Sequence, residues 1–503
     1  MSTSKELLLG IDIGTTGAKC TFYDLKGQAV SSGYQEYRMI HPQENWTEQD
    51  PNKWWQAVKE NIQLCIDSDD IDTKNVLCIG VSSTNAVMLL GKNDKIIYNG
   101  IGLHDQRADK QVEWLKENVG EKTVFDITGN NIVKGSFALP TLRWLIDNRP
   151  ELIDETEKFL IPNGFIIKKL TNEYSIDKPR SGLSLLNDLK KGTWSEEIVK
   201  KAQIPENILP PIFDSCSIVG QVTKTAATAT GLAAGTPVVA GAIDTISATI
   251  GAGAINPGDC AITIGSSGRI CQISATPVFK NHILSTAGAY KNQFAAVQTT
   301  DNAGISLKWF RDTFGKMVLQ DALSAGISVY DQMNRLCTQS QPGAKGLIYL
   351  PYLSGEKSPI WDPKARGTFF NINLDTTYSD FIRAVMEGVA FSIRHCMEEI
   401  SNNKDHTSPI PIGGGVAKSD VWCQIFADIL NRPIIQLETD ETETLGDIII
   451  AAQALNINQI PANFGAILAT KGKIKEPNLR NTERYSEQFS KYKELYKSIK
   501  HLF

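Results

Sequence analysis

The sequence predicts an α/β protein with two related lobes, and three observations support this prediction. The chain has 503 residues, whereas one hydrophobic core usually supports no more than roughly 250 to 300 residues. Strand and helix patterns alternate up to about residue 190, as is typical of α/β domains. A turn motif near the N-terminus, IDIGTTG at residues 11–17, returns as ITIGSSG at residues 262–268. The repeat places the join near residue 245, so we expect an N-terminal lobe at residues 1–245 and a C-terminal lobe at residues 246–503.

The composition is that of an ordinary globular protein. Apolar residues make up 42% of the chain and charged residues 21%, and the net charge of −5 does not favour nucleic acid as a partner. Nine cysteines are scattered without a C-x-x-C pair, so neither a disulfide framework nor a zinc site is indicated. No run reaches the roughly 20 apolar residues of a membrane helix, and no cleavable signal precedes the first strand. We therefore expect a cytoplasmic protein without a membrane partner.

The N-terminal lobe is predicted to open with an antiparallel meander. Residues 6–36 have the pattern of three strands, joined by the Gly-Thr-Thr turn and by a turn at residues 24–27. A helix then begins at Pro51, with Asp50 as its N-cap, and runs to about Cys65. The next patterns indicate a buried strand at residues 76–82 and helices at residues 105–117 and 139–148.

The C-terminal half repeats a strand-rich opening at residues 237–274. Apolar residues at helical spacing predict a long core helix at residues 378–401. No low-complexity linker separates the halves, so we expect the lobes to meet along a cleft with a hinge. Further helical patterns lie at residues 420–430 and 446–455, and a lysine-rich amphipathic helix is predicted at residues 485–500.

The two repeated turns have the residue types of a phosphate-binding site. In each, β-branched residues lead into a glycine and two hydroxyl residues, as when a buried strand ends in a tight hairpin turn. Such turns direct backbone N–H groups and hydroxyls toward an anion, and two of them suggest two lobes holding one nucleotide. The first turn carries Asp12 between its isoleucines where the second carries Thr263. One lobe could therefore hold a metal and the other only phosphate.

Asp12 and Lys19 are the candidate ionic residues beside the first turn. An ionised carboxylate flanked by isoleucines is costly unless it meets a cation or hydrogen-bond donors, and Mg²⁺ reached through water would supply the cation. The alternative is that Asp12 only caps the turn. Lys19, on the following strand, could reach back to a phosphate oxygen, although an exposed strand lysine is the commoner case.

Asp244 is the candidate catalytic base. It ends the apolar run at residues 237–243 and precedes a predicted helix, so it stands at a strand end on the boundary between the lobes. There its carboxylate would face the cleft and take a proton from an attacking hydroxyl. Phosphoryl transfer depends more on positioning and charge neutralisation than on a strong base, so an aspartate of ordinary basicity suffices. The alternative is that Asp244 only caps the helix.

Glycines and polar loops supply further candidates. The run IGGGVAKSD at residues 412–420 is a strand end, three glycines and a helix start, where the backbone can approach a nucleotide closely. It lacks the glycine spacing of a Walker P-loop, and a plain turn is the alternative. Thr84 and Asn85 follow one buried strand, and His104 and Asp105 follow another. Such groups suit a polyhydroxylated ligand, although exposed polar loops usually only stay hydrated.

Taken together, these motifs resemble the FGGY family of carbohydrate kinases, within the actin/hexokinase/heat-shock ATPase superfamily. The resemblance implies two RNase H-like lobes around a central nucleotide cleft that binds MgATP, with Asp244 as the base that deprotonates a sugar hydroxyl. It spans most of the chain and rests on an ordered series: GIDIGTT at 10–16, EQDP at 48–51, DQR at 105–107, Asp244, IGSS at 264–267, PYLSGE at 351–356, RAVMEGV at 383–389 and GGGVAKS at 413–419.

The resemblance also implies a role for each candidate residue. Asp12 would help to hold Mg²⁺, with Asp244 beside it. The residues expected to contact the sugar are Thr84, Asn85, His104, Asp105 and Asp244. Those expected to face the terminal phosphates are Gly14, Thr15, Thr16 and Lys19, and those expected to line the nucleotide are Gly265, Ser266, Gly304, Gly414, Gly415 and Lys418.

The substrate is split between two subfamilies. TIGSSG at residues 263–268 and SPIWD at residues 358–362 look more like gluconate kinases, whereas TGN at residues 128–130 looks more like xylulose kinases. Asn85 stands where both usually have histidine, and Leu103 where an aromatic residue is common. A later segment, residues 441–447, has acidic and hydroxyl residues where small ones are common.

We expect an ATP-dependent kinase that phosphorylates a primary hydroxyl of an open-chain sugar or sugar acid. Conversion of gluconate to 6-phosphogluconate is favoured over conversion of D-xylulose to xylulose 5-phosphate. The rival from another class is a nucleotide-gated ATPase clamp without a sugar substrate, which would need a peptide-binding or assembly segment. A nicotinamide-dependent dehydrogenase is disfavoured, because no G-x-G-x-x-G follows the first strand. The sequence does not determine the oligomeric state, and a homodimer is compatible with it.

Overall fold

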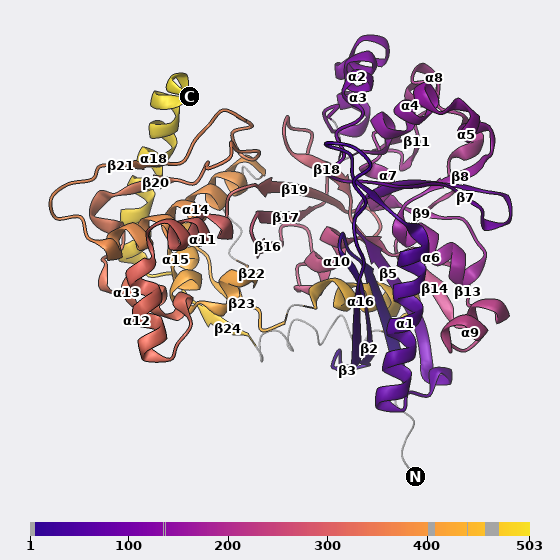
Figure 1. Ribbon diagram of the computed structural model, residues 1–503, viewed down its shortest axis with the longest axis horizontal. Helices are drawn as coiled ribbons and strands as arrows, with labels where there is room; N and C mark the ends of the chain where they lie inside the picture. Colours follow the sequence, from indigo (N-terminus) through magenta and orange to yellow (C-terminus); the bar gives the residue numbers. More distant parts are fainter. Residues whose placement is uncertain (1–5, 134, 136, 401–407, 440, 458–471) are drawn as a thin grey trace. The chain divides into compact units, whose positions relative to one another are not determined.

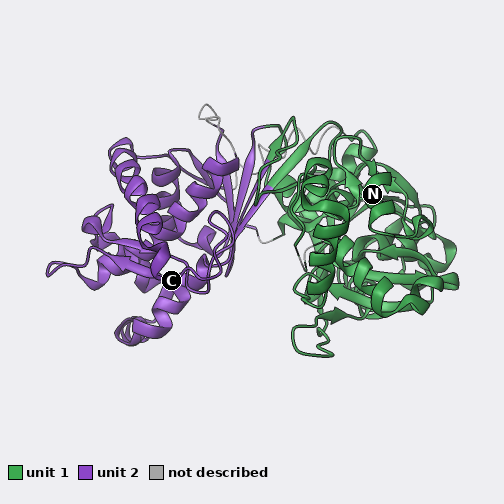
Figure 2. Cartoon of the chain, turned by 90° about the horizontal axis from the view of Figure 1, so that it is seen from above, with its two compact units in different colours: residues 1–257, 273–296, 441–466 green, residues 258–272, 297–440, 467–503 purple. Residues whose placement is uncertain are grey.

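The computed structural model describes residues 6–133, 135, 137–400, 408–439, 441–457 and 472–503. The chain forms two compact units, coloured separately in Figure 2. Each unit has helices packed around a β-sheet, so the predicted α/β class is confirmed (Figure 1). Each unit is built from three separate segments of the chain. The predicted division at residue 245 assumed one segment per lobe, whereas the units follow which residues contact one another in the fold. Unit 1 comprises residues 1–257, 273–296 and 441–466, and unit 2 comprises residues 258–272, 297–440 and 467–503.

The described elements have the following bounds. The strands are β1 (Leu7–Ile13), β2 (Gly17–Asp24), β3 (Ala29–Glu36), β4 (Glu48–Gln49), β5 (Val76–Ser83), β6 (Ala86–Gly91), β7 (Ile96–Gly102), β8 (Thr156–Leu160), β9 (Ile176–Asp177), β10 (Asn187–Asp188), β11 (Thr193–Trp194), β12 (Ile212–Phe213), β13 (Ile218–Gln221), β14 (Pro237–Val239), β15 (Ala242–Ile243), β16 (Cys260–Ile264), β17 (Gly268–Ser274), β18 (Leu284–Ala287), β19 (Phe294–Thr300), β20 (Ile348–Leu350), β21 (Thr368–Phe370), β22 (Ile410–Gly414), β23 (Ile434–Gln436) and β24 (Lys473–Lys475). The helices are α1 (Pro51–Asp69), α2 (Asp109–Leu115), α3 (Glu121–Thr128), α4 (Ala138–Asn148), α5 (Pro150–Asp154), α6 (Pro162–Thr171), α7 (Lys178–Gly182), α8 (Glu196–Lys201), α9 (Lys224–Thr230), α10 (Asp244–Gly251), α11 (Gly304–Phe314), α12 (Lys316–Ala325), α13 (Val329–Gln339), α14 (Tyr378–Ile400), α15 (Asp420–Leu430), α16 (Thr442–Ala454) and α18 (Leu479–Ile499).

The main sheet of unit 1 has the strand order β13-β14-β5-β1-β2-β3, with β15 alongside β5. Strands β1, β2 and β3 form the predicted antiparallel meander, while β1 and β15 both run parallel to β5. In this register Ser83 is the partner of both Ile13 and Ile243. The residues that follow these three strand ends therefore lie at one edge of the sheet, because parallel strands share their carboxyl ends.

Helix α16 packs on this sheet so closely that only glycines fit beneath it. A Cβ atom added to Gly80 would lie 2.1 Å from the carbonyl oxygen of Asp447. Against α10 the approach is equally close, since a Cβ on Gly446 would lie 1.9 Å from the carbonyl oxygen of Ser247. Such contacts leave no room for a side chain and hold α16, α10 and the sheet in one arrangement.

The second large sheet contains the strand run β17-β16-β22-β23-β24. Strands β16 and β17 are antiparallel and enclose the second repeated turn, while β16 and β22 are parallel. Ile264 is paired with Gly414 at the ends of these two strands. The second turn and the glycine run are therefore neighbours, although about 150 residues separate them in the chain.

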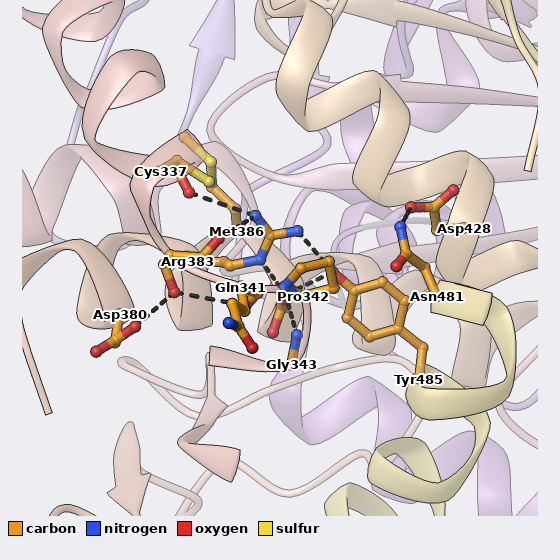
Figure 3. A network of polar contacts seen from close by, with 12 residues as sticks. Cys337, Gln341, Pro342, Gly343, Asp380, Arg383, Met386, Asp428, Asn481 and Tyr485 are labelled. Atoms are coloured by element: carbon orange, nitrogen blue, oxygen red, sulfur yellow. Dashed lines mark hydrogen bonds and ion pairs between the residues drawn. The ribbon is translucent and has the colours of Figure 1, made fainter. Parts of the chain in front are cut away.

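A buried polar network anchors the long helix α14, as Figure 3 shows. Arg383 forms an ion pair with Glu387 at 2.8 Å and donates to the hydroxyl of Tyr485 at 3.0 Å. Glu387 also accepts from the backbone N–H of Gly343 at 2.9 Å. Since Arg383 and Glu387 belong to the RAVMEGV motif, this part of the motif serves the packing of α14 against α18.

Most predicted helices are confirmed, and the differences have local causes. Asp50 caps α1, and α15 has its predicted bounds. The helix predicted from residue 105 begins instead at Asp109, because the Asp105 carboxylate accepts the backbone N–H groups of Thr47 and Arg107 and holds a turn. Residue 401, the predicted end of α14, lies outside the described residues. No helix in the described ranges is long and apolar enough to cross a membrane.

Candidate functional site

The carboxyl edge of the unit 1 sheet brings the first repeated turn and the Thr84 loop together. The backbone N–H of Thr84 donates to the carbonyl oxygen of Ile13 at 2.9 Å, and the hydroxyls of Thr15 and Thr84 lie 3.3 Å apart. Asp244 follows Ile243 at the same edge. The predicted phosphate turn, sugar loop and base thus meet at one place.

Two residues that the sequence analysis did not single out hold this turn. The hydroxyl of Tyr37 donates to the carbonyl oxygens of Gly14 and Gly17, at 2.6 and 3.0 Å, and the side-chain amide of Gln49 donates to the carbonyl oxygen of Thr15 at 2.5 Å. Carbonyl oxygens bound to the protein are kept from facing an anion, which favours phosphate binding by the turn. Gln49 lies in the EQDP motif, whereas nothing in the sequence marks Tyr37.

Asp12 lies partly exposed beside the turn, and its Oδ1 accepts from the hydroxyl of Ser82 at 2.8 Å. Burial, followed by the negative charges of Glu443 and Asp244, raises the pKa of Asp12 well above its ordinary value. The Ser82 hydroxyl and the charge of Lys19 act in the opposite direction. A bound cation would lower this pKa and stabilise the carboxylate.

The donor chemistry of this edge fits Mg²⁺. Among the described residues, no three His, Cys, Asp or Glu side chains are placed to share one metal ion. Mg²⁺ does not need such a cage, because it keeps several waters and is usually held by one or two carboxylates together with substrate phosphates. Asp12 could supply one carboxylate and Asp244, at the same sheet edge, the other.

Asp244 is the first residue of α10 and not its N-cap, a position held by Ile243. Its Oδ1 accepts from the backbone N–H of Thr245 at 2.5 Å and from the Thr245 hydroxyl at 3.0 Å. The side chain is partly exposed. These two donors fix the orientation of the carboxylate at the sheet edge, as a positioned base requires.

Asp447 is a buried carboxyl that the sequence analysis noticed only as a departure from small residues. Its Oδ2 accepts from Ser82 at 2.9 Å and its Oδ1 from Ser247 at 2.7 Å. It therefore links β5, which contacts Asp12 through Ser82, to α10, which begins at Asp244. Burial and the nearby charge of Asp12 raise the pKa of Asp447 well above its ordinary value.

We expect Asp447→Ala to lower the free energy of unfolding by roughly 1 to 3 kcal/mol, because the buried hydroxyl of Ser247 would lose its acceptor and that of Ser82 would keep only Asp12. Asp447→Asn should cost less than about 1 kcal/mol, since a carboxamide can accept from one serine and donate to the other. Urea denaturation of both variants tests this. Equal losses in the two variants would show that the links to Ser82 and Ser247 do not matter.

Lys19 and the sugar-loop candidates have mixed surroundings. The Lys19 ammonium lies 3.8 Å from the carboxylate of Glu441. His104 is exposed. Asp105 is buried and receives four hydrogen bonds, from the backbone N–H groups of Thr47 and Arg107 and from the Arg107 guanidinium. These bonds give Asp105 a structural role, and its predicted sugar contact stays a prediction.

Unit 2 contains a cavity of about 380 Å³ where its glycines gather. Five of the six residues predicted to line the nucleotide contribute to its wall, and the sixth, Gly414, directly precedes Gly415. A larger hollow of about 830 Å³ in unit 1 contains no predicted site residue, so size alone does not locate the site. The predicted lining residues in the smaller cavity are Gly265, Ser266, Gly304, Gly415 and Lys418.

The glycines of this cavity are required by close backbone approach. A Cβ on Gly304 would lie 2.3 Å from the carbonyl oxygen of Gly265. Gly414 has φ +79°, and a Cβ there would lie 2.4 Å from the carbonyl oxygen of Ile264. The backbone N–H of Gly304 donates to the carbonyl oxygen of Gly265 at 3.0 Å, so the second turn is held by the start of α11.

The cavity also has walls that the sequence analysis did not predict. Tyr330, Asn334 and Trp422 line it. The Ser419 hydroxyl lies 2.8 Å from the Asn334 side-chain oxygen, and the Trp422 indole donates to the carbonyl oxygen of Met386 at 3.0 Å. An aromatic and apolar wall beside polar glycine turns suits a nucleoside joined to phosphates.

Glu356 supports this part of unit 2 from a buried position. Its carboxyl accepts from the backbone N–H groups of Asp301 and Lys357, at 2.6 and 2.9 Å. Asp301 lies three residues before Gly304, the first residue of α11. Burial, with the charge of Asp301 adding to it, raises the pKa of Glu356 from 4.5 to about 8. The folded protein therefore keeps a proton on Glu356 that the unfolded chain has already released above pH 4.5.

The contribution of Glu356 to stability should be fully present below pH 4.5 and lost as pH rises through about 8. We therefore expect wild type to lose stability relative to Glu356→Gln as pH rises from 4.5 to about 8. Denaturant titrations at closely spaced pH values measure it, with the exposed Glu487→Gln as the control. Parallel pH profiles for wild type and Glu356→Gln would contradict the expectation.

Comparison of the sequence with known proteins gives matches over most of the chain. Sequence models of the FGGY family of carbohydrate kinases match residues 7–251 for the N-terminal domain and residues 260–455 for the C-terminal domain. The chain is 30% identical over 502 residues to the xylulose kinase of Lactococcus lactis subsp. lactis (strain IL1403), covering 98% of this chain and 96% of that one. It is 30% identical over 451 residues to the gluconokinase of Bacillus subtilis (strain 168), covering 89% and 87%.

Solved structures give the same result for the fold. The gluconate kinase from Lactobacillus acidophilus superposes with a TM-score of 0.88 at 27% identity, covering 99% of this chain and 98% of that one. The ligand-bound xylulose kinase from the same organism superposes with a TM-score of 0.87 at 28% identity, covering 98% of each chain. These matches confirm the fold predicted from the sequence. Because one neighbour is a gluconate kinase and the other a xylulose kinase, they do not choose between the two substrates.

Proposed function

Because this chain belongs to the FGGY family of carbohydrate kinases, we propose that it transfers the terminal phosphoryl group of ATP to a primary hydroxyl of an open-chain sugar or sugar acid, with gluconate as the leading substrate. The observation that carries the proposal is the pairing of Ser83 with both Ile13 and Ile243, which sets the phosphate turn, the Thr84 loop and Asp244 at one sheet edge.

Each residue at this edge has a chemical task. Asp244, oriented by Thr245, accepts the proton of the attacking hydroxyl. The turn at Gly14, Thr15 and Thr16 binds the transferred phosphoryl group through its N–H groups and hydroxyls. Bound Mg²⁺ would neutralise phosphate charge, and Asp12 would hold it. Positioning and charge neutralisation supply most of the catalysis in such a reaction.

The cavity of unit 2 binds the nucleotide in this proposal. Its glycines let the backbone approach the phosphates, and Tyr330 and Trp422 provide the wall for the nucleoside. Lys418 contributes positive charge at the same cavity. For Lys19 to contact the terminal phosphates, its ammonium must leave Glu441. This ion pair is weak, because it joins partly exposed groups 3.8 Å apart.

The test is ADP release from MgATP with gluconate, D-xylulose, L-ribulose, glycerol or no sugar in parallel. Strong stimulation by gluconate would support the proposal in full. Stimulation by D-xylulose alone would keep the kinase and replace its substrate. Equal slow hydrolysis in every well would overturn the proposal and favour a nucleotide-gated ATPase.

A further inference from the structure

Arg180, in the short helix α7, is a buried arginine next to the Thr84 loop. Only 5% of the surface of Arg180 is exposed to solvent. Its Nη2 donates to the carbonyl oxygens of Ser83 and Thr84, at 2.6 and 3.0 Å. These bonds hold the guanidinium against the loop predicted to contact the sugar.

The remaining guanidinium nitrogens have no hydrogen-bond partner among the residues that the structure describes. Nε is buried and has no acceptor among the described residues, and Nη1 has no hydrogen bond to them either. The nearby carboxylate of Asp177 is engaged elsewhere, since it accepts the backbone N–H of Arg180 at 2.8 Å and the side-chain amide of Asn163 at 2.9 Å. Within the described part of the chain, no carboxylate lies within 4.0 Å of the Arg180 guanidinium.

Two other buried arginines of unit 1 show what Arg180 lacks. Arg107 forms ion pairs with Glu48 and Asp105, at 2.9 and 2.8 Å. Arg143 is paired with Asp147. A guanidinium stays charged in proteins, so burying one without a paired anion is costly. Burial lowers the pKa of Arg180, and only the more distant charges of Asp177 and Asp244 oppose this effect.

We propose that Arg180 determines specificity by binding the carboxylate of a sugar acid, so that the substrate of this kinase is an aldonic acid and not a neutral ketose. The inference rests on the proposed kinase function. An aldonic acid carries its carboxylate at one end and its primary hydroxyl at the other. Asp244 would take the hydroxyl, and Nη1 of Arg180, oriented by the two carbonyl bonds of Nη2, would take the carboxylate.

The experiment compares kcat/KM for gluconate and for D-xylulose in wild type, Arg180→Gln and Arg180→Lys. Loss of a charged, desolvated partner should lower kcat/KM for gluconate by roughly 30- to 1000-fold in Arg180→Gln. The value for D-xylulose should change less than about threefold, and Arg180→Lys should recover part of the gluconate activity because its charge remains. Arg143→Lys, a buried arginine with its own carboxylate, is the matched control.

Equal losses for the acid and the ketose in Arg180→Gln would overturn the proposal and leave Arg180 as a support of the loop. Unchanged gluconate kinetics would overturn it as well. Binding of gluconate without nucleotide, measured by calorimetry, separates this proposal from the kinase function. If wild type binds gluconate and Arg180→Gln does not, the assignment of Arg180 stands even where no sugar stimulates ADP release. Thermal unfolding confirms that each variant is folded.

Discussion

Asp244→Asn should lower kcat for sugar phosphorylation by roughly 10²- to 10⁴-fold, the usual contribution of a positioned general base. A carboxamide cannot take up the proton of the attacking hydroxyl at neutral pH. Its oxygen can still accept from the N–H and hydroxyl of Thr245, so the start of α10 should keep its geometry. Steady-state ADP release gives kcat, and calorimetric titration gives the affinity for MgATP, which should remain within about threefold of wild type.

The control for Asp244→Asn is Asp126→Asn, which removes an exposed carboxylate that is paired with Lys122 on α3. It should leave kcat unchanged. A variant at Asp244 with ordinary turnover would refute the assigned base. Loss of nucleotide binding together with turnover would show that Asp244 supports the fold instead of the chemistry.

Asp12→Asn should lower kcat on the order of 100-fold and raise the Mg²⁺ concentration needed for half-maximal rate, because a neutral amide is a poor ligand for this ion. The same change should stabilise the protein in the absence of Mg²⁺. Burial, Glu443 and Asp244 raise the pKa of Asp12, so its ionised form is unfavourable in the folded state as pH rises. Removing that charge removes the cost, while the amide oxygen can still accept from Ser82.

Two measurements test this pair of effects. The rate is measured across a Mg²⁺ titration, and thermal unfolding is measured at neutral pH with a chelator present. Asp447→Asn is the control, because it neutralises the other carboxyl next to Ser82 but should keep the Mg²⁺ dependence of wild type. A less stable Asp12→Asn, or one with unchanged Mg²⁺ dependence, would contradict the expectation.

Much of the site was predictable because its signals are local. The Gly-Thr-Thr and Gly-Ser-Ser turns follow runs of β-branched residues, and both are hairpin turns in the structure. Asp50 as an N-cap and Pro51 as a first helical residue mark a helix start in the sequence, and α1 begins at Pro51. Gly414 was predicted from the run of three glycines, and its positive φ and close approach to Ile264 show why glycine stands there.

Other features depend on residues far apart in the chain and have no local signal. Tyr37 supports the first turn only because β3 lies beside β2. The helix predicted from residue 105 begins late because the Asp105 carboxylate finds Thr47, a partner 58 residues away. The local sequence favours a helix from residue 105, but the buried hydrogen bond between Asp105 and Thr47 keeps residues 105–108 out of the helix.

By itself the sequence determined the α/β class and the two glycine-hydroxyl turns, and it singled out Asp12 and Asp244 as candidate site residues, because strand periodicity and turn chemistry act over a few residues. Only the tertiary structure decided that Ser83 lies between Ile13 and Ile243, that Asp447 links Ser82 to Ser247, and that Arg180 is buried without an ion pair to any described residue. Sheet register, close helix packing and desolvation arise from contacts between distant segments, and these exist only once the chain has folded.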